Sequence, residues 1–438
     1  MSASASGARQ REGVVKRLRR GVVPQTASQP PHFPLGNHNG ASDPPGCSFV
    51  DLGDSTRVSF MLTPNGRGPF ATQAAELLAT VTSVLRSHRD QPMVVTSQTV
   101  FLRDESDQEQ CEKLFEEYYG AELPVTNFVL QPPCCGAALA LEAWAIGGPS
   151  VQVERFGRQT MAVSYDSVRW IYCAGIKPLL QSGGTYERAS DLFSQLAAAL
   201  AQAGSCLEQV VRTWFYLGGI TDPEAEGQRY FEFNRARGDA YRQVHFYRAL
   251  LEPGARPGVF PVSTGIGMTG GGMMAGCAAL QTGRVDARLV QLENPQQTPA
   301  YAYHPRYSRE SPRFSRALAL MLGRYVTTWI SGTASIVNSE SRYPGDIRRQ
   351  TEQTIDNIEQ LLTTQNFALH GLAGVKADLH DLAKIRVYLK RPEDFSACKA
   401  ICERRFGSVP AIYAVADVCR PELLVEIEGV AFSKSSGH

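Results

Sequence analysis

The sequence predicts a mixed α+β fold of three similar units fused in one chain, with sheets inside and helices outside. Three observations lead to this prediction. Apolar residues recur at helical spacing in some segments and at strand spacing in others. The order helix, strand, helix, proline, strand occurs three times between residues 47 and 434. A helix with one apolar stripe packs on the face of a sheet, which is a layer arrangement of α+β proteins.

The bulk composition excludes several classes of protein. The 438 residues include 44 basic and 43 acidic ones, a net charge of +1, so neither nucleic acid nor a membrane is expected as partner. No apolar run approaches the roughly 20 residues of a membrane-spanning helix, and the N-terminus lacks an apolar secretory signal. The ten cysteines form no Cys-x-x-Cys pair, which favours reduced thiols in the cytoplasm over disulfides or zinc.

The first two units follow an N-terminal arm. Residues 1–46 are rich in Ser, Ala, Gly, Pro and Arg and are expected to be disordered. Unit one, 47–148, is expected to contain a helix at 73–87, a strand at 93–102, a helix at 107–119 and a strand at 138–146. Unit two, 149–284, is expected to contain a helix at 185–203, a strand at 210–217, a helix at 224–244 and a strand that ends at Leu280.

The third unit, 285–438, repeats the pattern. Its helices are expected at 346–365 and 393–405, and its strands at 327–336, 383–389 and 423–428. In the last strand Glu426 and Glu428 share one face, because side chains alternate along a strand. Two carboxylates on one face indicate either a solvent-facing edge strand or a carboxyl group kept in a cleft for proton transfer.

Comparison of the units separates the two glutamates. Counted from the proline of each unit, Glu428 in the third unit corresponds to Glu142 in the first, which favours a structural role for Glu428. The same count sets Glu426 against two small, uncharged residues, Ala140 and Cys277. A structural requirement should recur in all three units. A lone acid at this position therefore predicts a functional carboxyl at Glu426.

Other residues of the third unit are candidates for binding. Gly332 lies near the end of a strand and would let a ligand approach the backbone, or it is a bulge or packing glycine. The segment from Tyr303 to Arg309, which includes Arg306, is either a polar surface loop or a binder of carboxylates.

Two further candidates sit in or near the strands. Arg386 lies in the middle of a strand, where a buried charge needs an acidic partner or a ligand. Cys419 is expected to be a small, weakly polar wall rather than a nucleophile, because no histidine is near it in sequence.

Several segments of the third unit resemble the Rid (YjgF) family of small trimeric enamine/imine deaminases, which have a chorismate-mutase-like fold. These segments are Ile330-Ser-Gly-Thr-Ala-Ser335, Lys384-Ile-Arg-Val-Tyr-Leu389, Val409-Pro-Ala-Ile412 and Val425-Glu-Ile-Glu428. The resemblance implies three fused Rid-like units forming a pseudo-trimer within one monomer. The deaminases carry an arginine just after the Pro-Ala pair, where this chain has Ile412.

Residues 285–432 are more similar to the chorismatase family. The similarity lies in Trp329-Ile-Ser-Gly-Thr-Ala-Ser-Ile336, Ser341-Arg-Tyr-Pro-Gly-Asp346 and Ala416-Asp-Val-Cys-Arg-Pro421. It implies cleavage of chorismate to pyruvate and a cyclic product, with Glu426 as the catalytic acid. It also implies that Gly332 and Cys419 tune the product towards 3-hydroxybenzoate, rather than towards a dihydroxycyclohexadiene carboxylate.

The expected mechanism needs no metal or organic cofactor. Glu426 would protonate the enol ether, and Arg386, Arg306 or Arg309 would hold the two carboxylates of chorismate. Two alternatives remain at this stage. One is a Rid-like imine hydrolase, and the other is a metabolite-binding protein in which Glu426 only accepts a hydrogen bond.

Overall fold

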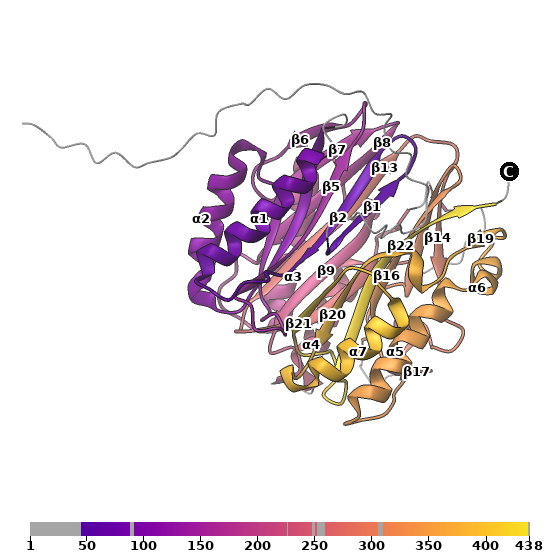
Figure 1. Ribbon diagram of the computed structural model, residues 1–438. Helices are drawn as coiled ribbons and strands as arrows, with labels where there is room; N and C mark the ends of the chain where they lie inside the picture. The colour runs from indigo at the N-terminus through magenta and orange to yellow at the C-terminus, as the bar shows by residue number, and fades with distance from the viewer. Residues whose placement is uncertain are drawn as a thin grey trace, which may run out of the picture. The chain divides into compact units, whose positions relative to one another are not determined.

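The computed structural model of the chain describes residues 45–87, 92–225, 227–247, 250–251, 259–304 and 310–436. Residues 1–44 of the predicted disordered arm lie outside the described residues. Within them, helices and sheets combine in the predicted mixed α+β fold, and the strands form three main sheets (Figure 1). Of the helices described, none is both long and apolar enough to cross a membrane.

The five-stranded sheet comes first in the chain, with strand order β1-β2-β5-β3-β4. Apolar side chains of α1 (Phe70–Ser87) and α2 (Gln108–Tyr119) pack with those of its strands in one core. The strands are β1 (Cys47–Asp51), β2 (Thr56–Leu62), β3 (Met93–Leu102), β4 (Val125–Leu130) and β5 (Leu139–Gly147).

The six-stranded sheet has the order β12-β9-β13-β8-β7-β6 and packs against α3 (Thr185–Gln202) and α4 (Arg229–Ala240). A two-stranded hairpin of β10 (Pro223–Glu224) and β11 (Gly227–Gln228) precedes α4. The strands of the main sheet are β6 (Gln152–Arg155), β7 (Thr160–Tyr165), β8 (Val168–Ile176), β9 (Val210–Gly218), β12 (Val262–Met268) and β13 (Met273–Thr282).

The seven-stranded sheet has the order β14-β15-β16-β22-β20-β21, and β19 also pairs with β22. Helices α5 (Ile347–Leu362), α6 (Thr364–Leu369) and α7 (Phe395–Phe406) cover one face of it (Figure 1). The strands are β14 (Ala287–Leu292), β15 (Ala317–Leu322), β16 (Tyr325–Ala334), β19 (Val375–Lys376), β20 (Leu382–Leu389), β21 (Ala411–Val415) and β22 (Val425–Ser435), and β17 (Ile336–Val337) pairs separately with β18 (Glu340–Ser341).

Local sequence accounts for α5. Asp346 caps its N-terminus, and the side chain accepts a hydrogen bond from the backbone N–H of Arg349 at 3.0 Å. The buried face includes Ile355, Ile358 and Leu362, at helical spacing. This face packs on β16 and β22, so α5 supports the two strands that carry Gly332 and Glu426.

The three main sheets repeat one pattern of pairing. In each, a central strand runs parallel to an edge strand and antiparallel to a long later strand. The faces turned away from the helices meet in one apolar cluster, to which the three central strands contribute Phe101, Tyr216 and Tyr388. The core that positions the site is therefore built from all three sheets.

The strand register corrects one step of the sequence comparison. Tyr388 pairs with Glu426 and Phe101 pairs with Ala140, but their equivalent Tyr216 pairs with Met274 rather than with Cys277. The connection that precedes the last strand is shorter in the six-stranded sheet, since it spans only residues 269–272 between β12 and β13. The counterparts of Glu426 are thus Ala140 and Met274, and both are uncharged.

Candidate active site

A cavity of about 210 Å³ lies where the six-stranded and seven-stranded sheets meet. Strand β12 and helix α4 line it from one sheet, and β16 and β22 line it from the other. The mixture of apolar and polar side chains is typical of pockets that bind small molecules. Of the residues singled out from the sequence, this cavity brings together Tyr303, Gly332, Cys419 and Glu426.

Glu426 points into this cavity from the start of β22 and is only 4% exposed. The alternative of a solvent-facing carboxyl therefore does not hold. Burial and the nearby charge of Glu428 raise the pKa of Glu426 to about 8, although Arg212 and Arg316 act in the opposite direction. Near neutral pH the Glu426 carboxyl is mostly protonated, as a general acid must be.

Gly332 faces the Glu426 carboxyl across the sheet. The pairing of β16 with β22 shifts between Ile330 and Thr333, so Gly332 lies in a β-bulge. The backbone N–H of Gly332 donates to the Thr264 hydroxyl at 3.1 Å. A Cβ atom at Gly332 would lie 2.9 Å from Cδ of Glu426, which is too close for an undisturbed contact. The absence of a side chain at Gly332 thus makes room for the Glu426 carboxyl.

Two buried arginines make the cavity cationic. Arg237 and Arg316 both line it and are 1% and 2% exposed. Arg237 donates to the Asn234 side chain at 2.5 Å, and Arg316 donates to the backbone oxygen of Thr298 at 3.1 Å. The Nε atoms of both arginines are buried without a hydrogen-bond partner, and neither arginine forms an ion pair with a described residue. Unpaired buried guanidinium groups favour an anionic ligand.

Tyr303 and Cys419 complete the wall near Glu426. The hydroxyl of Tyr303 contacts the Arg316 guanidinium. Burial, with the charge of Glu426 as a further cause, raises the pKa of the Cys419 thiol to about 12. The thiol is therefore neutral near pH 7, which favours the predicted role of a weakly polar wall over that of a nucleophile.

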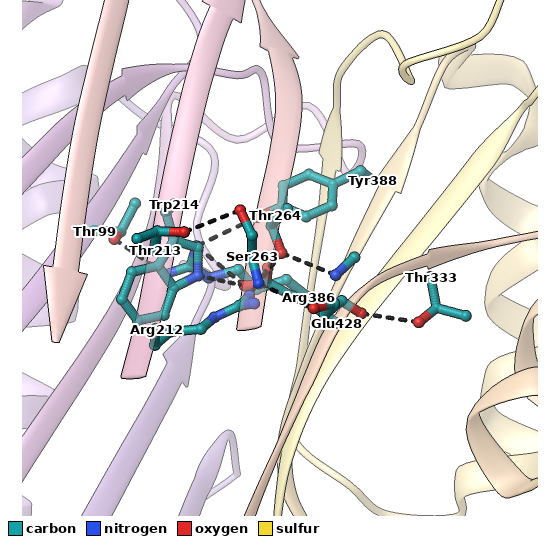
Figure 2. Close-up of polar contacts among 12 residues, drawn as sticks. Thr99, Arg212, Thr213, Trp214, Ser263, Thr264, Thr333, Arg386, Tyr388 and Glu428 are labelled. Carbon is teal, nitrogen blue, oxygen red and sulfur yellow. Dashed lines mark hydrogen bonds and ion pairs between the residues drawn. The ribbon is translucent and has the colours of Figure 1, made fainter. Parts of the chain in front are cut away.

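Arg386 does not line this cavity. Its guanidinium contacts the Glu142 carboxylate, lies 3.3 Å from Glu428 and donates to the Tyr216 hydroxyl at 3.0 Å (Figure 2 shows Arg386 and Glu428). The sequence allowed either an acidic partner or a ligand for this mid-strand charge, and the structure supplies the acids. The predicted role of Arg386 in holding substrate is corrected accordingly, because neighbouring acids already satisfy the charge.

Arg306 and Arg309 lie outside the described residues. Sequence reasoning missed several lining residues, of which only Arg420 is near Glu426 in sequence: Tyr230, Asn234, Arg237, Arg316 and Arg420. An arginine directly before a buried strand was a usable signal for Arg316. No such signal marks Arg237, which sits in an ordinary polar helix. Among the described residues, no group of three or more His, Cys, Asp or Glu is arranged to hold a metal ion.

Two family models match separate parts of the chain. The model described as "Chorismatase FkbO/Hyg5-like, N-terminal" matches residues 142–277. The model described as "Endoribonuclease L-PSP" matches residues 310–433, which include the segments that resemble the Rid family. The two matched regions supply the opposite walls of the cavity.

Similar proteins include a 3-hydroxybenzoate synthase from Streptomyces hygroscopicus, 34% identical over 66% of this chain and 80% of the relative. A chorismatase from Streptomyces rapamycinicus is 31% identical over 66% of this chain and 81% of its own length. A crystal structure of a chorismatase shares the fold, with a TM-score of 0.61, 20% identity and coverage of 87% of this chain and all of that one. On these similarities, this chain belongs to the chorismatase family.

Proposed function

We propose that this chain cleaves chorismate to pyruvate and 3-hydroxybenzoate by general acid catalysis, with Glu426 as the acid. The observation that carries the proposal is a buried carboxyl with a raised pKa, in a cavity that also holds two buried arginines without an ion-pair partner among the described residues. Chorismate is a dicarboxylate with an enol-ether side chain. It therefore needs both a proton donor and cations in the same site.

The proposed reaction begins with transfer of the Glu426 proton to the terminal methylene of the enol ether. In the resulting oxocarbenium ion, the neighbouring ring hydroxyl then attacks the ring carbon that bears the ether, so that a new C–O bond forms as the ether C–O bond breaks and pyruvate leaves. The resulting arene-oxide-like species rearranges to 3-hydroxybenzoate. A proton returns to Glu426 when the ring becomes aromatic, so the atoms of chorismate equal those of the two products. General acid catalysis of this kind contributes on the order of 10²–10⁴-fold.

The proposed roles of the other lining residues follow from their place in the cavity. Arg316 and Arg237 would bind the two carboxylates of chorismate, and Tyr303 would hold Arg316 in position. Gly332 and Cys419 would shape the space beside the ring, where water could compete for the oxocarbenium ion. Contributions from Arg306 and Arg309 stay predictions from the sequence.

The direct test is incubation of the purified protein with chorismate, followed by identification of the products. Equimolar pyruvate and 3-hydroxybenzoate support the proposal. A dihydroxycyclohexadiene carboxylate would indicate capture by water instead. Chorismate that binds without turnover would support the alternative of a metabolite-binding protein. The imine-hydrolase alternative is disfavoured, since Ile412 occupies the arginine position of the deaminases and is buried in the apolar cluster.

We also propose that the chain consists of the units 47–148, 149–284 and 285–438, arranged as a pseudo-trimer in a monomer, after an arm of residues 1–46. The repeated strand pairing and the shared apolar cluster support this organisation. Light scattering after size-exclusion chromatography should give the mass of one chain. We propose the cytoplasm as its compartment, where the ten cysteines, which are free thiols in the structure, would stay reduced.

A further inference from the structure

Glu428, two residues after Glu426, is surrounded by hydrogen-bond donors and cations (Figure 2). The Arg212 guanidinium and the Thr264 hydroxyl both contact its Oε2 atom. The indole N–H of Trp214 donates to its Oε1 atom at 3.0 Å, and the Arg386 guanidinium lies 3.3 Å from the same atom. Every one of these groups favours the ionised form of Glu428.

We propose that Glu428 is a positioning residue for the reaction, whose fixed negative charge keeps the proton on Glu426 at neutral pH. This role rests on the proposed function of Glu426 as the acid. Glu428 would act through the electrostatic potential at Glu426 and would not touch the substrate. Residues of both sheets would then set the protonation state of one carboxyl.

The charges around Glu426 explain why Glu428 decides the balance. From its own strand, Glu426 faces the negative charge of Glu428. From β9 and from the residue just before β15, it faces the cations Arg212 and Arg316. Tyr230 of α4 and Cys419 also face it, and burial holds both in their neutral forms. Arg237 of α4, Arg420 and the acid Glu422 line the same cavity. Of the charged groups that shift the pKa of Glu426, Glu428 is thus the one that opposes the two cations Arg212 and Arg316.

Arg212 is the cation that Glu428 offsets. Its guanidinium contacts Glu428 and donates to the Thr264 hydroxyl at 2.6 Å. Burial raises the pKa of Glu426, the charge on Glu428 raises it further, and Arg212 lowers it. Loss of the Glu428 charge would both remove a repulsion and free Arg212 to stabilise the Glu426 carboxylate. Both changes act in the same direction, towards a stronger acid at Glu426.

Thr264 connects this cluster to the site by direct contacts. Its hydroxyl accepts from the backbone N–H of Gly332 at 3.1 Å and donates to Glu428. The bulge at Gly332, which leaves room for the Glu426 carboxyl, is thus tied to the same hydroxyl that holds Glu428.

The test compares Glu428→Gln with a matched control, Glu142→Gln. Glu142 is equally buried and also pairs with Arg386, but it is not among the groups that act on Glu426. Pyruvate release from chorismate is followed against pH. We expect the alkaline loss of kcat/KM to move down by about one pH unit or more in Glu428→Gln. In Glu142→Gln the alkaline loss of kcat/KM should occur at the wild-type pH, even if the protein becomes less stable.

A second variant covers the case in which Glu428→Gln does not fold. Arg212→Gln removes a cation that acts on Glu426 and leaves Glu428 paired with Arg386, so the alkaline limb should move up. Shifts of opposite sign in the two variants would support the proposal, whereas an alkaline limb that stays at the wild-type pH in folded Glu428→Gln would indicate a purely structural role for Glu428. Titration of ¹³C-labelled Glu426 by NMR, assigned with Glu426→Gln, gives the same comparison without turnover.

The outcome separates this inference from the proposed function. Suppose that Glu426→Gln is inactive, but that the alkaline loss of kcat/KM stays at the wild-type pH in folded Glu428→Gln or Arg212→Gln. In that case only the role of Glu428 is overturned. If Glu426→Gln turns over chorismate at the wild-type rate, the acid itself has been misassigned.

Discussion

The carboxyl of Glu426 occupies the space that a side chain at Gly332 would fill. Gly332 lies in the β-bulge of β16, and Glu426 lies on the neighbouring strand β22, so the two positions act as one unit. The acid can sit deep in the cavity only because residue 332 has no side chain. The position of the proposed proton donor and the shape of the pocket are therefore linked.

Replacement of Gly332 by alanine should change both the rate and the products. The added methyl group would force the flexible end of Glu426 to rotate, which moves the proton donor away from its working position. We expect kcat to fall by up to about 100-fold, with a larger share of product from water capture. Product ratios from chromatography check this. Gly271→Ala is the control, because a Cβ atom at Gly271 meets open space, and it should behave as the wild type.

The activity of the wild-type protein should depend on pH through Glu426. Its pKa of about 8 predicts that kcat/KM is constant below that pH and falls tenfold per unit above it. Initial rates of pyruvate release between pH 6 and 10 check this, with the coupling enzyme in excess throughout. A flat profile across this range would be incompatible with a general acid at Glu426.

The free energy of unfolding should also depend on pH through Glu426. The folded-state pKa of Glu426 lies above its ordinary value of 4.5, so the folded chain holds a proton that the unfolded chain loses first. This contribution is present below about pH 4.5 and is lost as pH rises to about 8. The Glu426→Gln variant should therefore gain on the order of 5 kcal/mol relative to wild type across that interval. Denaturant unfolding measures it, and the exposed Glu117→Gln controls for loss of a charge.

Replacement of two arginines by methionine should affect different properties: stability for Arg386 and substrate binding for Arg316. Arg386→Met breaks a buried ion pair and should cost about 3–5 kcal/mol of stability, because Glu142 and Glu428 lose a partner. Arg316→Met removes a proposed carboxylate ligand and should raise KM for chorismate by about 10- to 100-fold. Steady-state kinetics and unfolding of both variants separate the roles. An unchanged KM in folded Arg316→Met would contradict the assignment of Arg316.

Much of the fold could be predicted because each element has a strong local signal. The strand expected at 93–102 is β3, and the helix expected at 185–203 is α3 with one residue less. Errors arose where a local interaction ended an element early. The helix expected at 346–365 ends at Leu362, because Thr363 adopts an extended conformation and caps α6 through a hydrogen bond from Asn366. The helix expected from residue 224 begins later because Glu224 pairs with Gly227 in a hairpin.

The site could be predicted only in part. Glu426 was accessible because comparison within the chain shows where the expected units differ. Gly332 was accessible because a glycine near the end of a strand lets a ligand approach the backbone. Arg237 was not, since it sits in an ordinary polar helix and reaches the cavity through the packing of one sheet on another. Arg316 had a signal in its place directly before a buried strand, but that signal does not name the cavity as its destination. For Arg386, the position in the sequence does not identify the partner of its charge, because a buried cation in a strand can bind a ligand or a neighbouring acid. Only the tertiary partners Glu142 and Glu428 decide between the two.

The most direct measurement is pyruvate release from chorismate by Glu426→Gln at pH 7, with circular dichroism to verify folding. Glutamine keeps the size of the side chain and its hydrogen bonding but cannot deliver the proton. We expect the folded variant to lose at least about 100-fold in kcat while it still binds chorismate. Wild-type turnover by a folded Glu426→Gln protein would contradict the central claim that this carboxyl is the acid.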